Sequence, residues 1–532
     1  MTESSQDPEK QTVELQLETR RGLQSSTDGV KQDKVIDNNY ATGVKVLMLI
    51  SAVTLMTFLT LLDQSIIATA IPQITSQFHS LPDLGWYGSA YQLACASLQP
   101  LSGKLYASFP SKWMYLSCVA IFELGSLLCG IANSSKMLIV GRAVAGMGAS
   151  GLNNGALSIL ANSTPLEKRP MHMGIMMGIA QMGLVIGPLL GGAFTEHVTW
   201  RLCFYINLPI GAVVAGFLLF LNIPEPVVKT SLLSVLATLP SKLDLVGFAL
   251  LAPSAIQLLL ALEYGGNEYA WNSSMIIGLF CGAGVTFLIF LYWESRQGGQ
   301  AMTPLPMLRQ RIVWTSCVNQ TSLIGMTLCT SYFLPMYFQA VKGVSPTLSG
   351  VDLLPTVLSQ LVGTVICGAL ASSVITAIGN GLISTFTPST STGKWIGYQI
   401  LIGTGRGLGF QVPIVAVQNT LSPAQIPVAM ALLMFCQTLG GAVFLVIANV
   451  IFSASLRTEI PWYAPGIDPE TVIGAGASSV RDVVTSTTAL AGTLTAYATS
   501  VGRVFYLAVG LSGIGLASAW GMGWKDIRKK GQ

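Results

Sequence analysis

Charged residues are scarce in this sequence. Asp, Glu, Lys and Arg make up only 10% of the 532 residues, whereas a soluble domain carries about 25%. Hydrophobic residues make up 51%, and the mean hydropathy is +0.60. This composition excludes an ordinary soluble domain and predicts an all-α integral membrane protein in contact with a lipid bilayer.

Histidine is also rare, and the cysteines are poorly placed for chemistry. The three histidines, His79, His172 and His197, lie far apart in the sequence, which argues against a metal site. The nine cysteines fall within hydrophobic segments and form no close pair. We therefore expect them to be small packing residues, not disulfide partners or metal ligands.

Signatures of several functional classes are missing as well. The sequence has no Gly-x-x-x-x-Gly-Lys loop to bind ATP, so a transporter of this sequence needs another energy source. No loop gathers His, Cys and carboxylates as the active site of an enzyme would. The sequence contains no filter-like loop and no ring of charges, so a channel is not expected. We expect no enzymatic activity and no cofactor.

Hydrophobic segments of about twenty residues fill the chain beyond residue 45, and this is the length that crosses a bilayer as a helix. Strands of an outer-membrane barrel would be half as long and would alternate in polarity. The sequence predicts about fourteen transmembrane helices, at 46–71, 83–107, 113–132, 137–161, 171–195, 201–221, 243–263, 273–293, 312–340, 350–371, 372–387, 395–420, 425–453 and 503–524.

The segment 1–45 is polar and mixed in charge, so we expect a disordered tail without a secretory signal. If this tail is cytosolic, nineteen of the 28 Lys and Arg residues fall on the cytosolic side and seven on the outer side. The positive-inside rule then places both termini in the cytosol. Because this orientation explains the net charge of +4, nucleic acid is not an expected partner. Asn133 and Asn272 begin Asn-Ser-Ser triplets on the outer side and are candidate glycosylation sites.

The stretch from Val351 to Phe386 contains one charge, Asp352, and no polar loop. As one helix it would be about 54 Å long, too long for one crossing and short for two. A single crossing would also place the basic C-terminal segment outside. We therefore predict two short helices joined by a tight turn near Ala371 to Ser373.

Two charged residues inside the predicted helices lie at similar depths. Asp63 lies about 13 Å below the outer end of the first helix, and Arg142 lies about 9 Å below Lys136. The two side chains are therefore predicted to meet in the outer half of the membrane. Two interpretations stay open: a static ion pair that fixes packing, or a carboxylate that exchanges a proton next to an arginine. Glu123, near mid-depth, is either a structural carboxyl or a second proton site.

Amides inside the predicted helices are the remaining polar candidates. Gln92, Asn153 and Gln181 either line a substrate cavity or form hydrogen bonds between helices.

The segment GLVIGPLLGG, 183–192, places glycines at every fourth position of the fifth helix: Gly183, Gly187 and Gly191. They form a bare stripe on which a second helix can pack closely, and Gly174 and Gly178 are expected to extend this stripe toward the cytosol. Pro188 should bend the helix there. Together with Gly192 these residues form either a gate between two states of a transporter or ordinary tight packing.

Three of these segments resemble motifs of the major facilitator superfamily. GLVIGPLLGG resembles its antiporter signature in the fifth span. LIVGRAVAGMGASG resembles its fourth-span motif, with Arg142 at the position of the motif's arginine. LLDQSIIATAIPQI resembles the first-span motif of the fourteen-span drug:proton antiporters, with Asp63 as the acidic residue. Together with FELGSLLCG and TGKWIGYQILIGTGRGLGFQVP, they make the chain beyond residue 45 similar to the fungal toxin and multidrug efflux branch.

One loop departs from the family pattern. The superfamily usually carries Gly-x-Leu-Ala-Asp-Arg and further basic residues between its second and third spans. Here the segment GKLYASFPSKWMYL contains no Asp and only Lys104 and Lys112 as basic residues. The usual charged contact between the two halves of the protein therefore lacks its acidic member.

The resemblance implies a defined organisation: a tail 1–45, a six-helix bundle 46–221, a linker with two extra spans 222–311, a second bundle 312–524 with a long outer loop 454–502, and a cytosolic tail 525–532. It places Arg406, in the second bundle, near the substrate or an acidic group. It also implies a plasma-membrane monomer that exports small amphipathic organic compounds, such as drugs, toxins or secondary metabolites, in exchange for protons. Proton-coupled uptake of a siderophore or nutrient by the same fold is the alternative.

Overall fold

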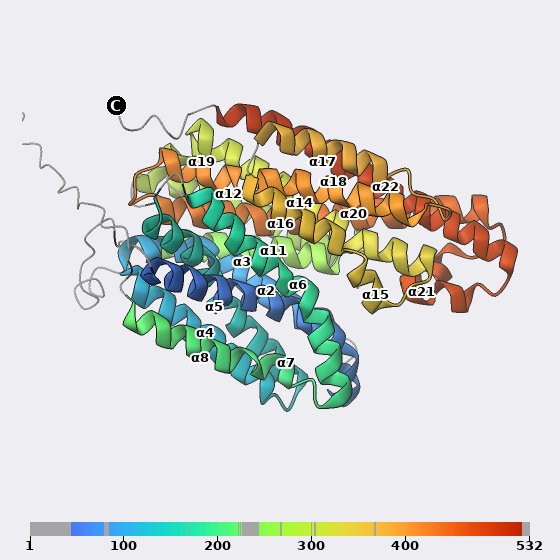
Figure 1. The fold of residues 1–532 in the computed structure, drawn as a ribbon, viewed down its shortest axis with the longest axis horizontal. Coiled ribbons are helices and arrows are strands. Elements are labelled where there is room, and N and C mark those ends of the chain that lie inside the picture. Colours follow the sequence, from blue (N-terminus) through green and yellow to red (C-terminus); the bar gives the residue numbers. More distant parts are fainter. Residues whose placement is uncertain are drawn as a thin grey trace, which may run out of the picture. The chain divides into compact units, whose positions relative to one another are not determined.

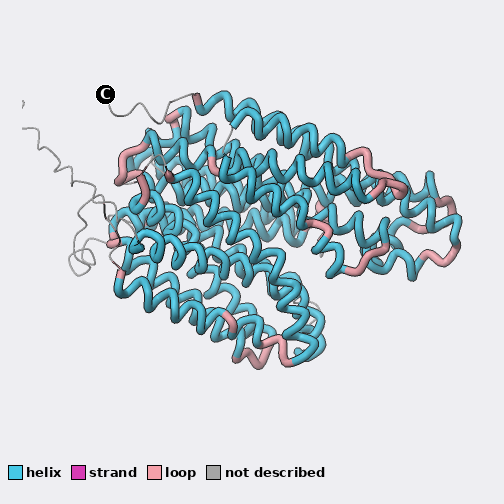
Figure 2. The backbone as a smooth tube through the Cα atoms, in the orientation of Figure 1, coloured by secondary structure: helices cyan, strands magenta, loops and turns pink. Residues whose placement is uncertain are grey.

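The computed structural model describes residues 44–78, 84–165, 168–221, 223, 225, 244–266, 269–298, 301–302, 305–366 and 369–523. Both expected tails, apart from Val44 and Lys45, lie outside these residues. Helix is the dominant regular structure throughout the described ranges (Figure 2), which otherwise contain one isolated bridge between Gly265 and Tyr269. The all-helical architecture predicted from hydrophobic run length is confirmed.

The first group of helices packs within the N-terminal half of the chain. Its members are α2 (Val44–Phe78), α3 (Leu84–Ser108), α4 (Ser111–Gly130), α5 (Ser135–Ser163), α6 (Arg169–His197), α7 (Leu202–Tyr205) and α8 (Asn207–Phe220). The main packing pairs are α2 with α6 and α5 with both α3 and α4. The expected helix 46–71 is longer in the structure, because the helical pattern continues to Phe78.

Two helices, α11 (Leu245–Tyr264) and α12 (Ser274–Gln297), follow as an adjacent pair. Leu251 and Ala255 of α11 and Phe290 of α12 form a buried apolar cluster with Leu101 of α3 and with Phe435 of α20 (Ile426–Tyr463), in the C-terminal half of the chain. The α11–α12 pair therefore packs where helices of both groups come together.

The second group packs within the C-terminal half. After α13 (Leu305–Leu308), its members are α14 (Arg311–Met336) with the π-helical turn η3 (Tyr337–Lys342), α15 (Pro346–Val351), α16 (Leu354–Ile366), α17 (Ala369–Ile383), α18 (Thr392–Phe410), α19 (Val412–Thr420), α20 (Ile426–Tyr463), α21 (Pro469–Val483) and α22 (Thr487–Met522). Figure 1 shows α16, α17 and α18 running alongside one another, and α14 packs against α20 and α22.

Nine helices in the described ranges are long and apolar enough to cross a membrane. Large apolar side chains also face outward, including Phe220, which is 91% exposed, and Leu288, which is 66% exposed. Such exposed apolar surface is favourable in contact with lipid tails and unfavourable in water. We call the end of the helices at which α2 begins and α22 ends the terminal face; it lies at the left in Figure 1.

The uniform apolar stretch 351–386 is a helical hairpin, but its predicted turn is misplaced. Residues 371–373 are helical and belong to α17, which begins at Ala369, whereas α16 ends at Ile366; residues 367–368 lie outside the described residues. Helix directions establish the reversal. The α18 glycines approach α16 at Gly403 to Thr356 and Gly407 to Gln360, and α17 at Gly405 to Thr376 and Gly409 to Ser372. Along these contacts, residue numbers increase in the same direction in α18 and α16 and in opposite directions in α18 and α17. The helices α16 and α17 are therefore antiparallel.

Candidate functional site

The structure brings Asp63 and Arg142 into direct contact. Arg142 Nη1 of α5 donates to Asp63 Oδ2 of α2 at 2.5 Å, and the two side chains are 1% and 0% exposed. Depth along each helix was sufficient to anticipate this pairing, because both residues lie partway along hydrophobic segments. An unpaired charge in such surroundings would be strongly unfavourable, so the pair explains how both residues remain inside the protein.

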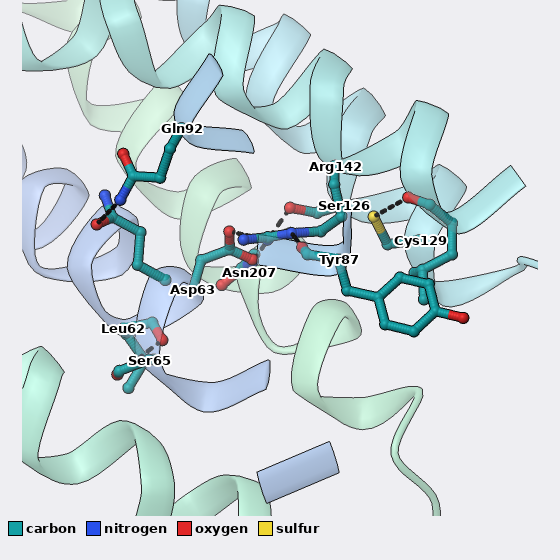
Figure 3. A network of polar contacts seen from close by, with 11 residues as sticks. Leu62, Asp63, Ser65, Tyr87, Gln92, Ser126, Cys129, Arg142 and Asn207 are labelled. Carbon is teal, nitrogen blue, oxygen red and sulfur yellow. Dashed lines mark hydrogen bonds and ion pairs between the residues drawn. The ribbon is translucent and has the colours of Figure 1, made fainter. Parts of the chain in front are cut away.

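The side-chain amide of Asn207 binds the second oxygen of the Asp63 carboxylate (Figure 3). Asn207 Nδ2, at the start of α8, donates to Asp63 Oδ1 at 3.1 Å and to Ser126 Oγ of α4 at 3.1 Å. Asp63 therefore accepts one hydrogen bond on each oxygen. The site links four helices, α2, α4, α5 and α8.

Arg142 is held by two further groups that do not depend on Asp63. Its Nε donates to the backbone oxygen of Tyr87 on α3 at 2.9 Å. The guanidinium carbon also lies 4.5 Å from the ring centroid of Tyr91, a distance typical of a cation–π contact. The arginine thus keeps its position if the carboxylate becomes neutral.

Glu123 lies close to this site but does not join it directly. Its two carboxyl oxygens are buried and have no hydrogen-bond partner among the described residues. A β-carbon at Gly211 of α8 would overlap Glu123 Oε1, so the carboxyl group rests against that glycine. Gly211 is one turn along α8 from Asn207, and Glu123 is one turn along α4 from Ser126. A second carboxyl group therefore lies about one helical turn from Asp63's partners.

The four expected cavity residues have different partners in the structure. Gln92 is exposed, and its Nε2 donates to Gln64 Oε1 at 3.2 Å. Asn153 is half-buried and contacts the Cys95 thiol.

Gln181 and Arg406 lie in a different region, between α6 and the second group. Gln181 lines a cavity of about 10 Å³ together with Gln360 of α16. Arg406 Nη2 of α18 donates to Gln360 Oε1 at 2.9 Å. Gln360, which the sequence analysis did not single out, therefore connects the two predicted residues.

The glycine stripe of α6 packs against α2. A β-carbon at Gly183 would lie 2.7 Å from the backbone oxygen of Phe58, and one at Gly187 would lie 2.9 Å from the backbone nitrogen of Ile66. Ser65 Oγ also donates to the backbone oxygen of Gly183 at 3.0 Å. These contacts flank Asp63 on both sides along α2.

The expected extension of the stripe is wrong. Gly174 and Gly178 face α16, where β-carbons would lie 2.9 Å from Thr364 O and 2.8 Å from Leu361 Cγ. The reason is the five-residue step from Gly178 to Gly183, which rotates a helix by about 140°. The helix α6 therefore has two glycine faces, one toward α2 and one toward α16.

The remaining residues of this segment have smaller roles in packing. Gly191 is buried, whereas a β-carbon at Gly192 would meet no atom within 4 Å. The helix continues through Pro188, whose side chain lies outside the described residues.

A separate charged cluster lies near the terminal face. Lys104 of α3 is 8% exposed and interacts electrostatically with Glu294 of α12 and with Asp244, which precedes α11. Asp244 Oδ1 accepts from Trp293 Nε1 at 2.8 Å. Lys104 thus obtains acidic partners from the α11–α12 pair, although its own loop contains no Asp.

Other predicted positions lie on the surface or carry no metal chemistry. Asn133 and Asn272 are exposed and lie two residues before the first residues of α5 and α12. Within the described ranges, no three His, Cys, Asp or Glu side chains are grouped as metal ligands, and the cysteines found there are free.

Sequence reasoning missed Asn207, Ser126, Tyr87 and Tyr91. A signal existed for Asn207 alone, because an amide within an apolar segment needs a partner. The sequence contains no comparable signal for the backbone oxygen of Tyr87 or for the ring of Tyr91.

Known proteins resemble this chain in sequence or in structure. Residues 53–445 match the model of the Major Facilitator Superfamily. The chain is 55% identical to the MFS-type transporter pigP of Monascus ruber, over 98% of this chain and 94% of that one. It is 49% identical to the efflux pump mlcE of Penicillium citrinum, over 98% and 96%. Its structure resembles the proton:xylose symporter XylE with a TM-score of 0.55 at 13% identity, covering 87% of this chain and 94% of that one.

The matched family model covers most of the chain, and the fungal relatives align over nearly its whole length. The protein is a multi-pass membrane protein that belongs to the major facilitator superfamily, within its fungal efflux branch.

Proposed function

We propose that the protein exports amphipathic organic compounds in exchange for protons, with Asp63 as the proton-binding residue. Fungal relatives that are named efflux pumps support export. The buried Asp63–Arg142 pair, with Asn207 on the second carboxylate oxygen, is the observation that carries proton coupling. A carboxyl group so placed can be neutralised by one proton without leaving Arg142 unsupported.

The proposed cycle uses the contacts of each residue. Protonation of Asp63 removes the negative charge that attracts Arg142, which stays in place through the Tyr87 oxygen and the Tyr91 ring. The link between α2 and α5 weakens at that moment. Deprotonation restores it, because Arg142 and Asn207 both donate to the ionised form. Glu123 is the second candidate for a proton, since its oxygens lack partners in the described residues.

The conformation supports an outward-facing state. The two groups of helices contact each other near the terminal face, where Gly174 packs on Thr364 and a β-carbon at Gly103 would lie 2.6 Å from Ala431 Cβ, and α6 also contacts α15. We place this face in the cytosol, with both termini, in a plasma-membrane monomer of fourteen spans. These spans form two six-helix bundles and an extra pair, α11 and α12. Asn133 and Asn272 are then outside the cell and accessible for glycosylation.

The test is transport in inside-out vesicles with an acidic interior. We expect Asp63→Asn to bind substrate but to lose uptake driven by the pH gradient, because an amide keeps the shape of the side chain without exchanging a proton. Arg142→Lys keeps the charge but not the planar fork, so it should impair coupling less than Arg142→Ala does.

The matched control is Gln92→Leu, an exposed amide outside the ion pair. Uptake by Asp63→Asn at the wild-type rate would show that the proton binds elsewhere, and Glu123→Gln is then the next variant. Accumulation that requires the opposite gradient would favour import over export.

A further inference from the structure

Arg406 is a buried cation that uses few of its hydrogen-bond donors. The residue is 3% exposed, and its Nη2 donates to Gln360 Oε1. Its Nε and Nη1 are buried and have no partner among the described residues. A guanidinium has five N–H donors, so a single amide oxygen leaves most of its donor capacity unused.

The second arginine within the helices, Arg142, shows the contrast. Arg142 has a carboxylate, a backbone oxygen and an aromatic ring as partners. Within the described ranges, no carboxylate forms an ion pair with Arg406. A positive charge in a membrane interior is unfavourable unless an anion or a strong acceptor compensates it. Arg406 therefore lacks the compensation that the chain gives to Arg142.

The position of Arg406 suits a ligand and not a lipid. Ile400 and Leu401, on the same helix, are 45% and 37% exposed, and at about 100° per residue they lie on the far side of α18 from Arg406. Arg406 lies about 21 Å along the helix from Thr392 and as far from the end of α19. It is thus central in depth, where substrates of this kind of transporter are expected to bind.

The surroundings of Arg406 change if the helix groups separate. Its partner Gln360 lines the cavity of about 10 Å³ at the contact between α6 and α16, opposite Gly178 and Gln181. This space holds about one water molecule, so the outward-facing state has no room there for an organic acid. Separation of α6 from α16 at the terminal face would open this space toward the cytosol.

We propose that Arg406, assisted by Gln360, binds the acidic group of the exported compound, so that the substrates are amphipathic organic anions such as carboxylates. A carboxylate accepts two parallel hydrogen bonds from a guanidinium and supplies the missing negative charge. Binding occurs from the cytosol, and closure of α6 on α16 leaves no space for the anion. This inference rests on the proposed export function and does not depend on which residue carries the proton.

The experiment uses the full-length protein in lipid nanodiscs with two matched probes, 1-pyrenebutyrate and its methyl ester. They differ in one negative charge. We expect the acid to bind and to raise the melting temperature of the wild-type protein more than the ester does. Arg406→Gln should weaken binding of the acid by at least about tenfold, since hydrogen bonds to charged groups are the strong ones. Ester binding should stay the same, and Arg406→Lys should be intermediate.

Two controls keep the result specific. Lys394→Gln removes one exposed positive charge from the same helix and should leave acid binding unchanged. Without any ligand, Arg406→Gln should melt no lower than the wild type, because it removes an uncompensated charge. A lower melting temperature would mark Arg406 as structural and overturn the proposal.

Equal binding of acid and ester to the wild type, or no binding of either, also contradicts the proposal, as does acid binding that survives Arg406→Gln. A response to sodium chloride equal to that with 1-pyrenebutyrate would assign the site to an inorganic anion. Asp63→Asn should keep acid binding, so a failure of proton coupling and a failure of anion recognition give different results.

Discussion

Arg142 and Arg406 carry the same charge into a hydrophobic interior, but the chain surrounds them differently. Arg142 shares a closed set of contacts with Asp63, Tyr87 and Tyr91. Arg406 has one amide oxygen and two unpaired nitrogen atoms among the described residues. The first arrangement satisfies the arginine with groups of the protein itself, and the second leaves donors for the ligand that we propose.

Asn207 provides a residue-scale prediction for the proton site. Its amide donates to Asp63 and to Ser126, so it connects α8 to α2 and α4. Asn207→Leu removes both hydrogen bonds and leaves Asp63 Oδ1 and Ser126 Oγ without this donor inside the protein, which is unfavourable for buried polar groups. We expect a lower melting temperature and slower export than in the wild-type protein. Thermal unfolding in lipid nanodiscs and uptake into vesicles test this prediction.

Gln92→Leu removes an exposed amide of the neighbouring helix and should leave the melting temperature in place. A melting temperature of Asn207→Leu equal to that of the wild type would contradict the stabilising role of the amide.

The candidate site was partly readable from the sequence. The depths of Asp63 and Arg142 followed from helix rise and run length, and these are properties of each segment alone. The donor Asn207 lies on a different helix, and its distance from Asp63 is set by packing among α2, α4 and α8. Such packing has no local signature in the sequence. The Arg406 nitrogens without hydrogen-bond partners among the described residues are likewise visible only in the three-dimensional structure.

At the element scale, α6 performs two packing roles with two glycine faces. Gly183 and Gly187 bring it against α2, within one helix group, and Gly174 and Gly178 bring it against α16, in the other. The periodic stripe predicted the first contact surface. It failed for the second because a single five-residue step changes the face of a helix. The turn near 371 was misplaced for a related reason: a uniform apolar run contains no polar residue to mark where the helix ends.

Gly174 gives the prediction for this element. A side chain at Gly174 would meet the backbone oxygen of Thr364, and backbone cannot move aside as a side chain can. Gly174→Val should therefore separate α6 from α16 and favour the state that is open at the terminal face. We expect slower export with normal abundance in the membrane, and faster reaction of a cysteine placed at position 361 with a maleimide added from the cytosolic side.

Gly192→Val is the matched control, because a β-carbon there meets no atom within 4 Å. Gly187→Leu should behave differently from Gly174→Val, since it disturbs α2 beside Asp63 and abolishes export. Unchanged cysteine reactivity in Gly174→Val would show that this contact does not close the terminal face.

At the scale of the whole molecule, the α11–α12 pair connects the two helix groups. Its buried residues pack against Leu101 of α3 and Phe435 of α20, and the carboxylates of Asp244 and Glu294 attract Lys104 electrostatically. The sequence shows that the loop after the second span has no Asp, but the acidic residues near Lys104 come from a distant segment and depend on the tertiary fold.

The proposed arrangement of fourteen spans makes a topological prediction. In a variant without other reactive cysteines, a single cysteine at position 368 should react with an impermeant maleimide only after the plasma membrane is permeabilised. The reason is that α16 and α17 are antiparallel, so α16 ends and α17 begins on the side nearer the terminal face, which we assign to the cytosol. A tag after Gln532 should likewise be inaccessible from outside the cell. Labelling of that tag in intact cells would contradict an even number of spans.

The two-faced packing of α6 also has a thermodynamic consequence. The helix that separates from α16 is the helix whose Gly183 oxygen accepts a hydrogen bond from Ser65, two residues beyond Asp63. If proton occupancy at Asp63 changes the free energy of the α6–α16 contact, then linkage requires that opening this contact change the affinity for the proton by the same factor. A compound that holds the α6–α16 contact open would therefore change the proton affinity of Asp63 without touching its carboxylate. Along α6, this contact at Gly178 lies about 1.5 helical turns from Gly183.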